Sequence, residues 1–260
     1  MHTRRAVIVQ LLSCTLAGAA LLTSGCATIS PAEVANTLVQ EGQALYNAKR
    51  YDEALAKFRE ATAKDPNNWN AYLWIARASI AKGAWGEAIA GGRRAFELSP
   101  QGPEVATIFF QALFGGGMEA LNGGRFADSI KYLSEYLRHQ PTNAGAWTNV
   151  GKAYMGNKQF ADGLGALTKA LGIAGSDRGD ILKNIFGGGL QAFSQRDYGS
   201  AIALMREYVG QDPRNLQAYL TLAKSYWESG QRSGALEAFR EVLKISPTNG
   251  EALQFLRQLL

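Results

Sequence analysis

Apolar residues recur along most of this chain at helical spacing, in a pattern that repeats about every 34 residues. A motif of one aromatic, three small or acidic and one aliphatic residue begins at Tyr51, Phe126, Phe160 and Tyr198. Prolines, which cannot continue a helix, follow at fixed distances and are Pro66, Pro100, Pro141, Pro213 and Pro247. A unit of this size cannot bury its own apolar face. The pattern therefore predicts pairs of helices that stack on their neighbours.

The signature residues of these units resemble the tetratricopeptide repeat (TPR) family. In the first unit they are Leu38, Gly42, Leu45, Ala54, Phe58, Ala61 and Pro66. In the fourth unit Gly175 stands where the family has proline. The resemblance implies an all-α fold, a right-handed α-solenoid over residues 35–260 with six helix-turn-helix repeats. The predicted repeats are 35–68, 69–102, 110–143, 144–177, 182–215 and 216–249, and the closing helix is 250–260.

A second, longer period of 72 residues is also visible. Phe114 and Phe186 are 72 residues apart, and each precedes three glycines, 115–117 and 187–189. Both repeats follow extra residues, 103–109 and 178–181. Pro103 suits the start of a helix, and Asp177 or Asp180 suits a helix cap. We therefore expect longer first helices in the third and fifth repeats, and three duplicated double units.

Each of these helical glycines costs about 1 kcal/mol relative to alanine. Two explanations stay open: close contact with a neighbouring helix, or exposed backbone on which a partner segment lies. A phosphate-binding loop is excluded, because no strand precedes the glycines and no Gly-Lys-Ser/Thr follows.

The N-terminal segment differs from the repeats. Arg4 and Arg5 precede an uncharged apolar run from Ala6 to Leu22, and Ser24-Gly25-Cys26 follows. This order resembles a bacterial lipoprotein signal peptide, although Thr23 replaces the usual leucine. The resemblance implies a signal peptide at 1–25 and a tether at 26–34 that is lipidated at Cys26. An uncleaved anchor helix is the alternative, but the run is shorter than the about 20 apolar residues that span a bilayer.

Residue 27 is alanine rather than the aspartate typical of inner-membrane retention. The expected location is therefore the outer membrane of a Gram-negative bacterium, with the chain facing the periplasm. Ser30 and Glu33 form a predicted capping box around Pro31, which leaves only residues 27–29 as free tether.

Composition excludes several functions. Removing residues 1–25 takes away two arginines and no acid, so the net charge falls from +5 to +3, which is too mild to indicate nucleic-acid binding. The mature chain would hold one cysteine, Cys26, and one histidine, His139. We interpret His139 as an ordinary surface residue near the end of a helix. No metal site, cofactor or catalytic set is expected.

By resemblance, TPR proteins bind partners along a concave groove formed by the first helices of the repeats. The residues at the groove positions are Tyr46, Leu73, Arg77, Ile80, Phe114, Met118, Leu121, Thr148, Lys152, Met155, Phe186, Leu190, Phe193, Leu220, Lys224 and Trp227. Arg77, Lys152 and Lys224 occupy one equivalent position. Basic groups between aromatic pockets favour an extended or helical partner segment that carries acids.

Two other interpretations stay open for these residues. Phe114 and Phe186 can instead be core residues, and the three cations can form a solvated face. The family's clamp for a C-terminal carboxylate is not expected, because Val39 and Gln43 stand at its first-repeat positions.

The sequence thus predicts a membrane-anchored, non-enzymatic scaffold that binds a protein partner in the bacterial envelope. Its architecture is similar to that of the pilotins of pilus and secretion secretins. Two alternatives stay open: an adaptor for cell-wall or exopolysaccharide enzymes, and a structural homo-oligomer.

Overall fold

A computed structural model describes residues 29–173 and 175–259 of the chain. Within these ranges the fold is all-helical, with thirteen α-helices and no strand. The helices are α1 (Pro31–Asn47), α2 (Tyr51–Lys64), α3 (Trp69–Ala81), α4 (Trp85–Leu98), α5 (Pro103–Asn122), α6 (Phe126–His139), α7 (Ala144–Gly156), α8 (Phe160–Leu171), α9 (Arg178–Ser194), α10 (Tyr198–Gln211), α11 (Leu216–Glu228), α12 (Arg232–Ile245) and α13 (Gly250–Leu259). The predicted signal peptide and Cys26 lie outside the described residues.

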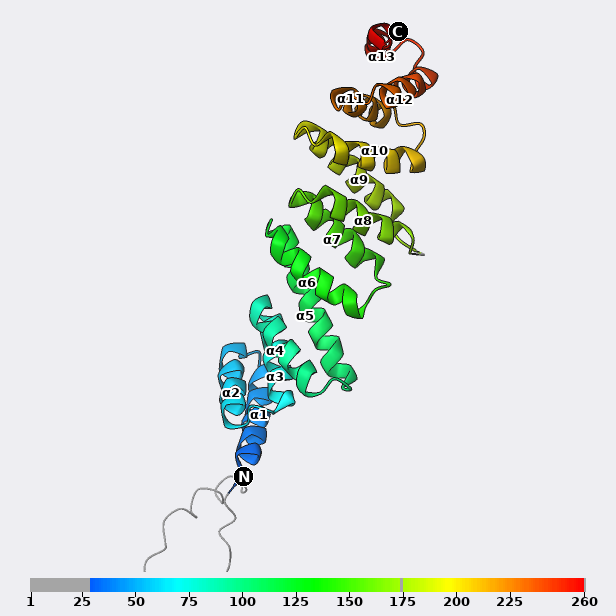
Figure 1. The fold of residues 1–260 in the computed structure, drawn as a ribbon. Helices are drawn as coiled ribbons and strands as arrows, with labels where there is room; N and C mark the ends of the chain where they lie inside the picture. The colour runs from blue at the N-terminus through cyan, green and yellow to red at the C-terminus, as the bar shows by residue number, and fades with distance from the viewer. Residues whose placement is uncertain (1–28, 174, 260) are drawn as a thin grey trace, which may run out of the picture.

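The helices stack in chain order into an elongated solenoid, with α1 at one end and α13 at the other (Figure 1). Each helix packs mainly against the helices next to it in sequence, as expected for a repeat protein. We call the first helix of each pair an A helix (α1, α3, α5, α7, α9 and α11) and the second a B helix (α2, α4, α6, α8, α10 and α12). The closing helix α13 packs on α12. The predicted α-solenoid is confirmed.

The starts of the A helices follow from local sequence. Ser30 and Glu33 form the predicted capping box at α1, with Pro31 as its first residue. Helix α1 thus begins inside the range predicted as tether. An asparagine side chain caps α3, α7, α11 and α13 through the backbone N–H three residues later; these residues are Asn68, Asn143, Asn215 and Asn249.

The A helices of the third and fifth repeats are long, as predicted. Helix α5 has 20 residues and α9 has 17, against 13 in each of α3, α7 and α11. Pro103 opens α5, and Asp177 caps α9 by accepting a hydrogen bond from the Asp180 N–H at 3.0 Å. Of the two predicted caps, Asp177 is therefore the one used.

The turn from each A helix to its B helix needs one residue in the left-handed conformation. Glycine takes this position in three repeats. In the other three repeats the residue is Lys49, Lys158 or Arg196, each with a φ of 60–63°. The backbone then reverses direction within a few residues. This shared turn keeps the geometry of the six pairs alike.

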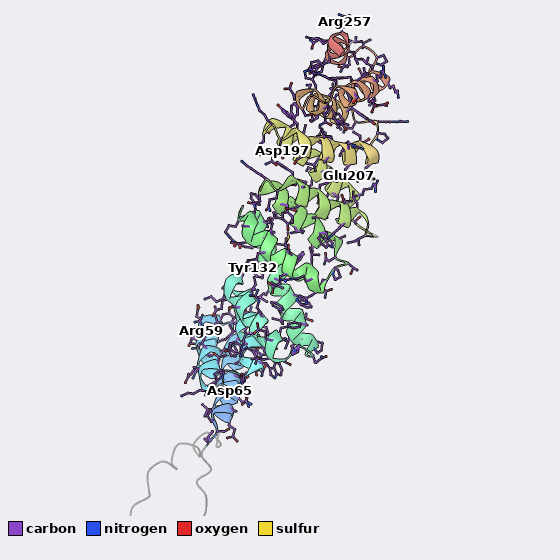
Figure 2. The ribbon with its side chains drawn as sticks, viewed as in Figure 1. Arg59, Asp65, Tyr132, Asp197, Glu207 and Arg257 are labelled. Carbon is purple, nitrogen blue, oxygen red and sulfur yellow. The ribbon has the colours of Figure 1, made fainter. Side chains whose placement is uncertain are left out.

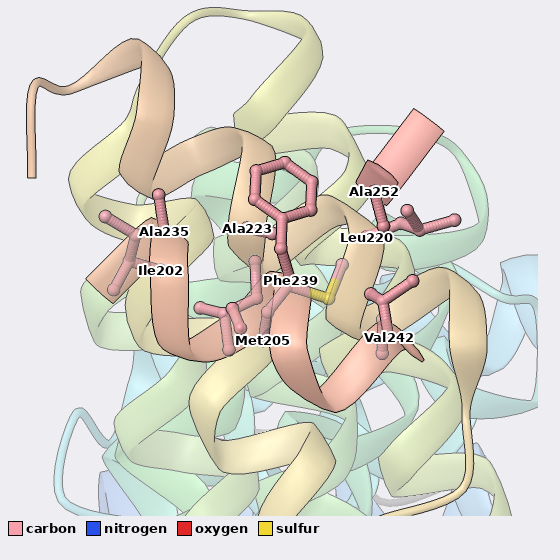
Figure 3. Packing of buried hydrophobic residues seen from close by; sticks show 11 residues of the cluster. Ile202, Met205, Leu220, Ala223, Ala235, Phe239, Val242 and Ala252 are labelled. Carbon is pink, nitrogen blue, oxygen red and sulfur yellow. The ribbon is translucent and has the colours of Figure 1, made fainter. Parts of the chain in front are cut away.

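Buried apolar side chains form a continuous series of clusters between the helices. In the last cluster, Ile202 and Met205 of α10 face Phe239 and Val242 of α12 (Figure 3). Charged side chains such as Arg59 lie on the outside of the stack (Figure 2). The core is therefore a layer that runs the length of the solenoid.

Most of the paired glycine triplets sit where neighbouring helices approach closely. A Cβ on Gly117 would come within 2.6 Å of Leu133 Cγ on α6, and one on Gly189 within 2.6 Å of Met205 Cε on α10. Trp85 covers Gly115 in the same way. Gly187 is the exception, because it is exposed and has open space around its Cα. Close helix contact is the right explanation for every glycine of the triplets except Gly187.

Candidate partner-binding groove

Two adjoining pockets open on the A-helix face in the N-terminal half of the solenoid. The first, of about 310 Å³, is lined by Tyr46, Arg77, Ile80, Ala81, Ile108 and Gln111. The second, of about 320 Å³, is lined by Thr107, Phe110, Gln111, Phe114, Tyr136 and Gln140. Gln111 lines both pockets, so they form one continuous surface, which we call the A-helix groove.

Helix α5 forms the centre of this groove because of its extra N-terminal turns. Thr107 and Ile108 belong to the extra residues 103–109, and each lines one pocket. Residues spaced by three or four lie on one face of a helix, which places Thr107, Gln111 and Phe114 in one row. The insertion before the third repeat thus builds a large part of the groove wall.

Arg77 is held firmly at the side of the first pocket. Its guanidinium pairs with Glu104 in the first turn of α5 and lies 4.7 Å from the centre of the Trp74 ring. The Arg77 side chain is 24% exposed, and its buried Nε has no hydrogen-bond partner among the described residues.

The second pocket is lined by aromatic rings that pack on one another. Phe110 stacks on the His139 ring at 4.9 Å between centroids, and Phe114 lies 5.3 Å from Tyr136. The Asn143 amide that caps α7 also donates to the Tyr136 hydroxyl at 2.9 Å. The cap therefore fixes the tyrosine wall of the pocket.

A related arrangement recurs 72 residues later with one aromatic ring fewer. Phe186 lies 5.0 Å from Tyr208, whose hydroxyl accepts from Asn215 at 3.0 Å. Burial, and then a hydrogen bond to Asp212, raise the pKa of Tyr208 above its ordinary value. Leu182 stands at the position of Phe110, so the fifth repeat lacks the second ring. Phe114 and Phe186 are both half-buried, between the two roles predicted for them.

The structure corrects the expectation of free cations along the groove. Arg77 pairs with Glu104, as described above. Lys152 pairs with Asp180 at 2.7 Å, and Lys224 pairs with Glu251 at 2.6 Å. Each acid lies in the first turn of the next long A helix or of α13. The repeated cations therefore bind the chain's own acids and join successive double units.

Some residues at predicted groove positions are buried and cannot contact a partner. Leu73 is 1% exposed in a cluster with Ala95 and Val105, and Met155 is 6% exposed against the backbone of Gly163 and Gly188. Thr148 and Leu220 are buried as well. Their positions turn beneath the next repeat, so assigning them to the groove was wrong.

The remaining predicted residues are half-buried on A helices outside the two pockets. They are Met118, Leu121, Leu190, Phe193 and Trp227. Phe193 packs on Tyr198 at 5.8 Å, and Trp227 lies between Arg232 and Phe255. Of the predicted set, the pockets bring together Tyr46, Arg77, Ile80 and Phe114.

Sequence reasoning missed several residues of the groove: Thr107, Ile108, Phe110, Gln111, Tyr136 and Gln140. His139, interpreted as an ordinary surface residue, packs on the groove residue Phe110. The pair of adjacent aromatics Phe109-Phe110 beside the extra residues was the available signal.

Two kinds of feature are not found in ranges 29–173 and 175–259. No group of three His, Cys, Asp or Glu side chains there could hold a metal ion. None of the helices there combines the length and apolar character needed to cross a membrane.

Comparisons with known proteins agree with this fold. A family model described as tetratricopeptide repeat matches residues 39–103 and 114–178, and a second model with that description matches residues 192–260. Among curated proteins, the BBSome complex member BBS4 of Bos taurus is 21% identical over 235 residues, which cover 77% of this chain and 43% of the relative. The chain thus spans less than half the length of that relative.

Solved structures with similar folds are also known. A Naa15/Naa10 complex bound to HypK-THB is 15% identical with a TM-score of 0.51, over 87% of this chain and 34% of that chain. PilW, described as a type IV pilus biogenesis factor, is 21% identical with a TM-score of 0.34, over 86% of this chain and 99% of that chain. Likeness at these identities shows the fold alone.

Proposed function

Because the chain belongs to the tetratricopeptide repeat family, we propose that it is a protein-binding scaffold of the bacterial envelope. In this proposal a lipid on Cys26 holds it on the outer membrane, and the solenoid faces the periplasm. The repeats suit protein binding, since stacked helices present long, rigid surfaces.

The observation that carries the binding proposal is the A-helix groove. Its two pockets combine aromatic and aliphatic side chains with polar groups that would orient a bound segment. A partner segment would place one apolar side chain in each pocket. Gln111 lies between them and would hydrogen-bond the backbone of that segment.

Two features support membrane attachment near the start of the solenoid. The described chain begins with Ile29, which is 71% exposed, and Trp69 at the start of α3 is 41% exposed. The Asn68 amide donates to Asn36 of α1 at 3.0 Å, so these two helices are joined near their N-terminal ends. Tryptophan favours the interface between lipid and water. This end would therefore face the bilayer beside the predicted lipid.

The pathway we favour is assembly of a pilus or secretion secretin, with the chain acting in the manner of a pilotin. An adaptor for cell-wall or exopolysaccharide enzymes is the second candidate, and a homo-oligomer the third. All three would use a groove for a protein segment, and the captured partner distinguishes them.

The test is photo-crosslinking in cells from a reactive residue at Gln111, with Ala90 on α4, also exposed, as the matched control. We expect one discrete envelope protein from Gln111 and none from Ala90. A secretin would identify the pilotin role, a wall or polysaccharide enzyme the adaptor role, and the chain itself the oligomer. Identical products from both positions would contradict the groove as the binding site.

Membrane attachment has a separate test. Cys26→Ser removes the thiol that would carry the lipid, so we expect the protein to leave the membrane fraction. Unchanged fractionation would contradict lipidation and favour an uncleaved N-terminal helix.

A further inference from the structure

A further pocket lies between α10, α11 and α12, outside the A-helix groove. Its volume is about 740 Å³. Tyr219, Leu222 and Tyr226 of α11 form its apolar wall, and Arg206 of α10 and Arg240 of α12 line it as well. We call this pocket the B-helix groove.

Arg206 and Arg240 occupy a position of the repeat that is arginine in four of the six B helices. The other two are Arg59 and Arg93, in the first and second repeats. Arg59 pairs with Glu87 at 2.6 Å, and Arg93 pairs with Glu135 at 2.7 Å. In both pairs the carboxylate comes from the next B helix.

In the last repeat one of these carboxylates is missing and the other is engaged elsewhere. Gly234 stands at the repeat position that Glu87 occupies in the second repeat, and Glu241 stands at the position that Glu135 occupies in the third. Among the described residues, neither Arg206 nor Arg240 forms an ion pair, although both line the groove with Glu237 and Glu241. Glu241 pairs instead with Lys244 at 2.6 Å. Two guanidinium groups are therefore left beside an open apolar wall.

The Tyr226 ring, which forms part of the groove wall, packs directly on Gly234, where a Cβ would come within 2.8 Å of it. In the fourth repeat the equivalent space is covered, because Lys169 lies 4.5 Å from the centre of the Trp147 ring. Trp147 corresponds to Tyr219, and Lys169 corresponds to Glu241. The fourth and sixth repeats therefore differ at this surface.

We propose that the B-helix groove docks an acidic amphipathic segment of a partner protein, with carboxylates on Arg206 and Arg240 and an apolar side chain against Tyr219 and Tyr226. The guanidinium fork binds a carboxylate through two parallel hydrogen bonds. The partner supplies the charges that Glu87 and Glu135 supply to the first two repeats. This surface is separate from the A-helix groove, so the chain can hold two segments at once.

The probe is a short fluorescein-labelled peptide built of alternating glutamate and leucine pairs, and its affinity for the full chain is measured by fluorescence anisotropy. The test variant carries Arg206→Gln with Arg240→Gln. The matched control carries Arg59→Gln with Arg93→Gln, which removes the same charge at equivalent, ion-paired positions. We expect about a tenfold loss of affinity in the test variant and little change in the control.

Three further measurements make the result specific. Ile108→Glu in the A-helix groove should leave the peptide affinity unchanged, which separates this site from the proposed function. A peptide with lysine in place of glutamate should not bind. A photoreactive form of the acidic peptide should crosslink to residues 206–244 of the unsubstituted chain, a readout that does not depend on any variant folding.

Several outcomes would overturn the proposal. These are no binding of the acidic peptide, equal weakening in the two arginine variants, binding lost with Ile108→Glu, equal binding of the lysine peptide, or crosslinks outside residues 206–244. Self-association that the acidic peptide and the test variant both abolish would assign the groove to a second copy of the chain instead.

Discussion

At the scale of single residues, the glycine triplets of α5 and α9 show that the same motif can place a glycine against a neighbouring helix at one position and on the exposed surface at another. Gly117 lies under Leu133, a fully buried residue of α6. Gly187 lies on an exposed surface with nothing within 4 Å of the place a Cβ would occupy. Both are helical, so both carry the same backbone cost relative to alanine. Only Gly117 has a packing reason for that cost.

Alanine substitution at these two positions should therefore change stability in opposite directions. Gly187→Ala should raise the free energy of unfolding by up to about 1 kcal/mol, because helix propensity improves without a clash. Gly117→Ala should lower it by about 1–3 kcal/mol, because Leu133 must move within a packed core. Urea unfolding followed by circular dichroism measures both. Equal effects of the two substitutions would show that packing around Gly117 is looser than the structure indicates.

At the scale of elements, the repeated cations work as joints between double units. Arg77, Lys152 and Lys224 each reach from the A helix of an even repeat to the first turn of the next A helix or of α13. An acid in a first turn also interacts favourably with the helix dipole. Each pair therefore supports the start of the helix it reaches, as well as the contact between repeats.

The joint between α7 and α9 should show a modest, salt-dependent coupling. Lys152 and Asp180 are 30% and 36% exposed, so water and salt screen their attraction. A double-mutant cycle with Lys152→Ala and Asp180→Ala should give a coupling of about 0.5 kcal/mol that shrinks at high salt. The same cycle with Lys152 of α7 and Asp162 of α8, which do not form an ion pair with each other, is the control and should give none. A coupling insensitive to salt would contradict this account.

Periodicity was sufficient to predict the order of the helices and the length of α5 and α9, because spacing, caps and proline positions are local properties. The pairing of Lys152 with Asp180 was not predictable, since repeat position shows which face a residue shares but not which acid of the next helix reaches it. Leu73 was misassigned for a related reason. The rotation that buries it depends on how the following repeat packs.

The groove itself was only partly predictable. Tyr46, Arg77 and Ile80 fell on the right face because their repeats match the family spacing. Thr107 and Ile108 were missed because residues 103–109 lie outside that spacing, and an insertion has no equivalent position from which a role can be carried over. The pocket between α10, α11 and α12 was missed because the pattern of hydrophobic positions does not show where helices leave a pocket between them.

At the scale of the whole molecule, an elongated solenoid has no single core, and each repeat depends on its immediate neighbours. The C-terminal end shows how the series is closed. Phe255 of α13 stacks on Phe239 at 4.8 Å between ring centroids and lies 5.0 Å from Trp227. One helix thus shields the aromatic side chains of α11 and α12 from water.

Removing that shield should weaken the last repeats and leave the first ones unchanged. Phe255→Ala deletes a half-buried ring, so we expect a local loss of about 2 kcal/mol, less than for a fully buried phenylalanine. Amide hydrogen exchange in α11 and α12 should then accelerate by roughly 30-fold, while α1 to α4 keep their rates, because no packing contact connects those helices directly to α13. Leu253→Ala, which removes an exposed side chain from the same helix, is the control and should change exchange little. If Phe255→Ala accelerated exchange equally from α1 to α12, the solenoid would unfold as one cooperative unit, and the repeats could not be treated as neighbours that stabilise one another pairwise.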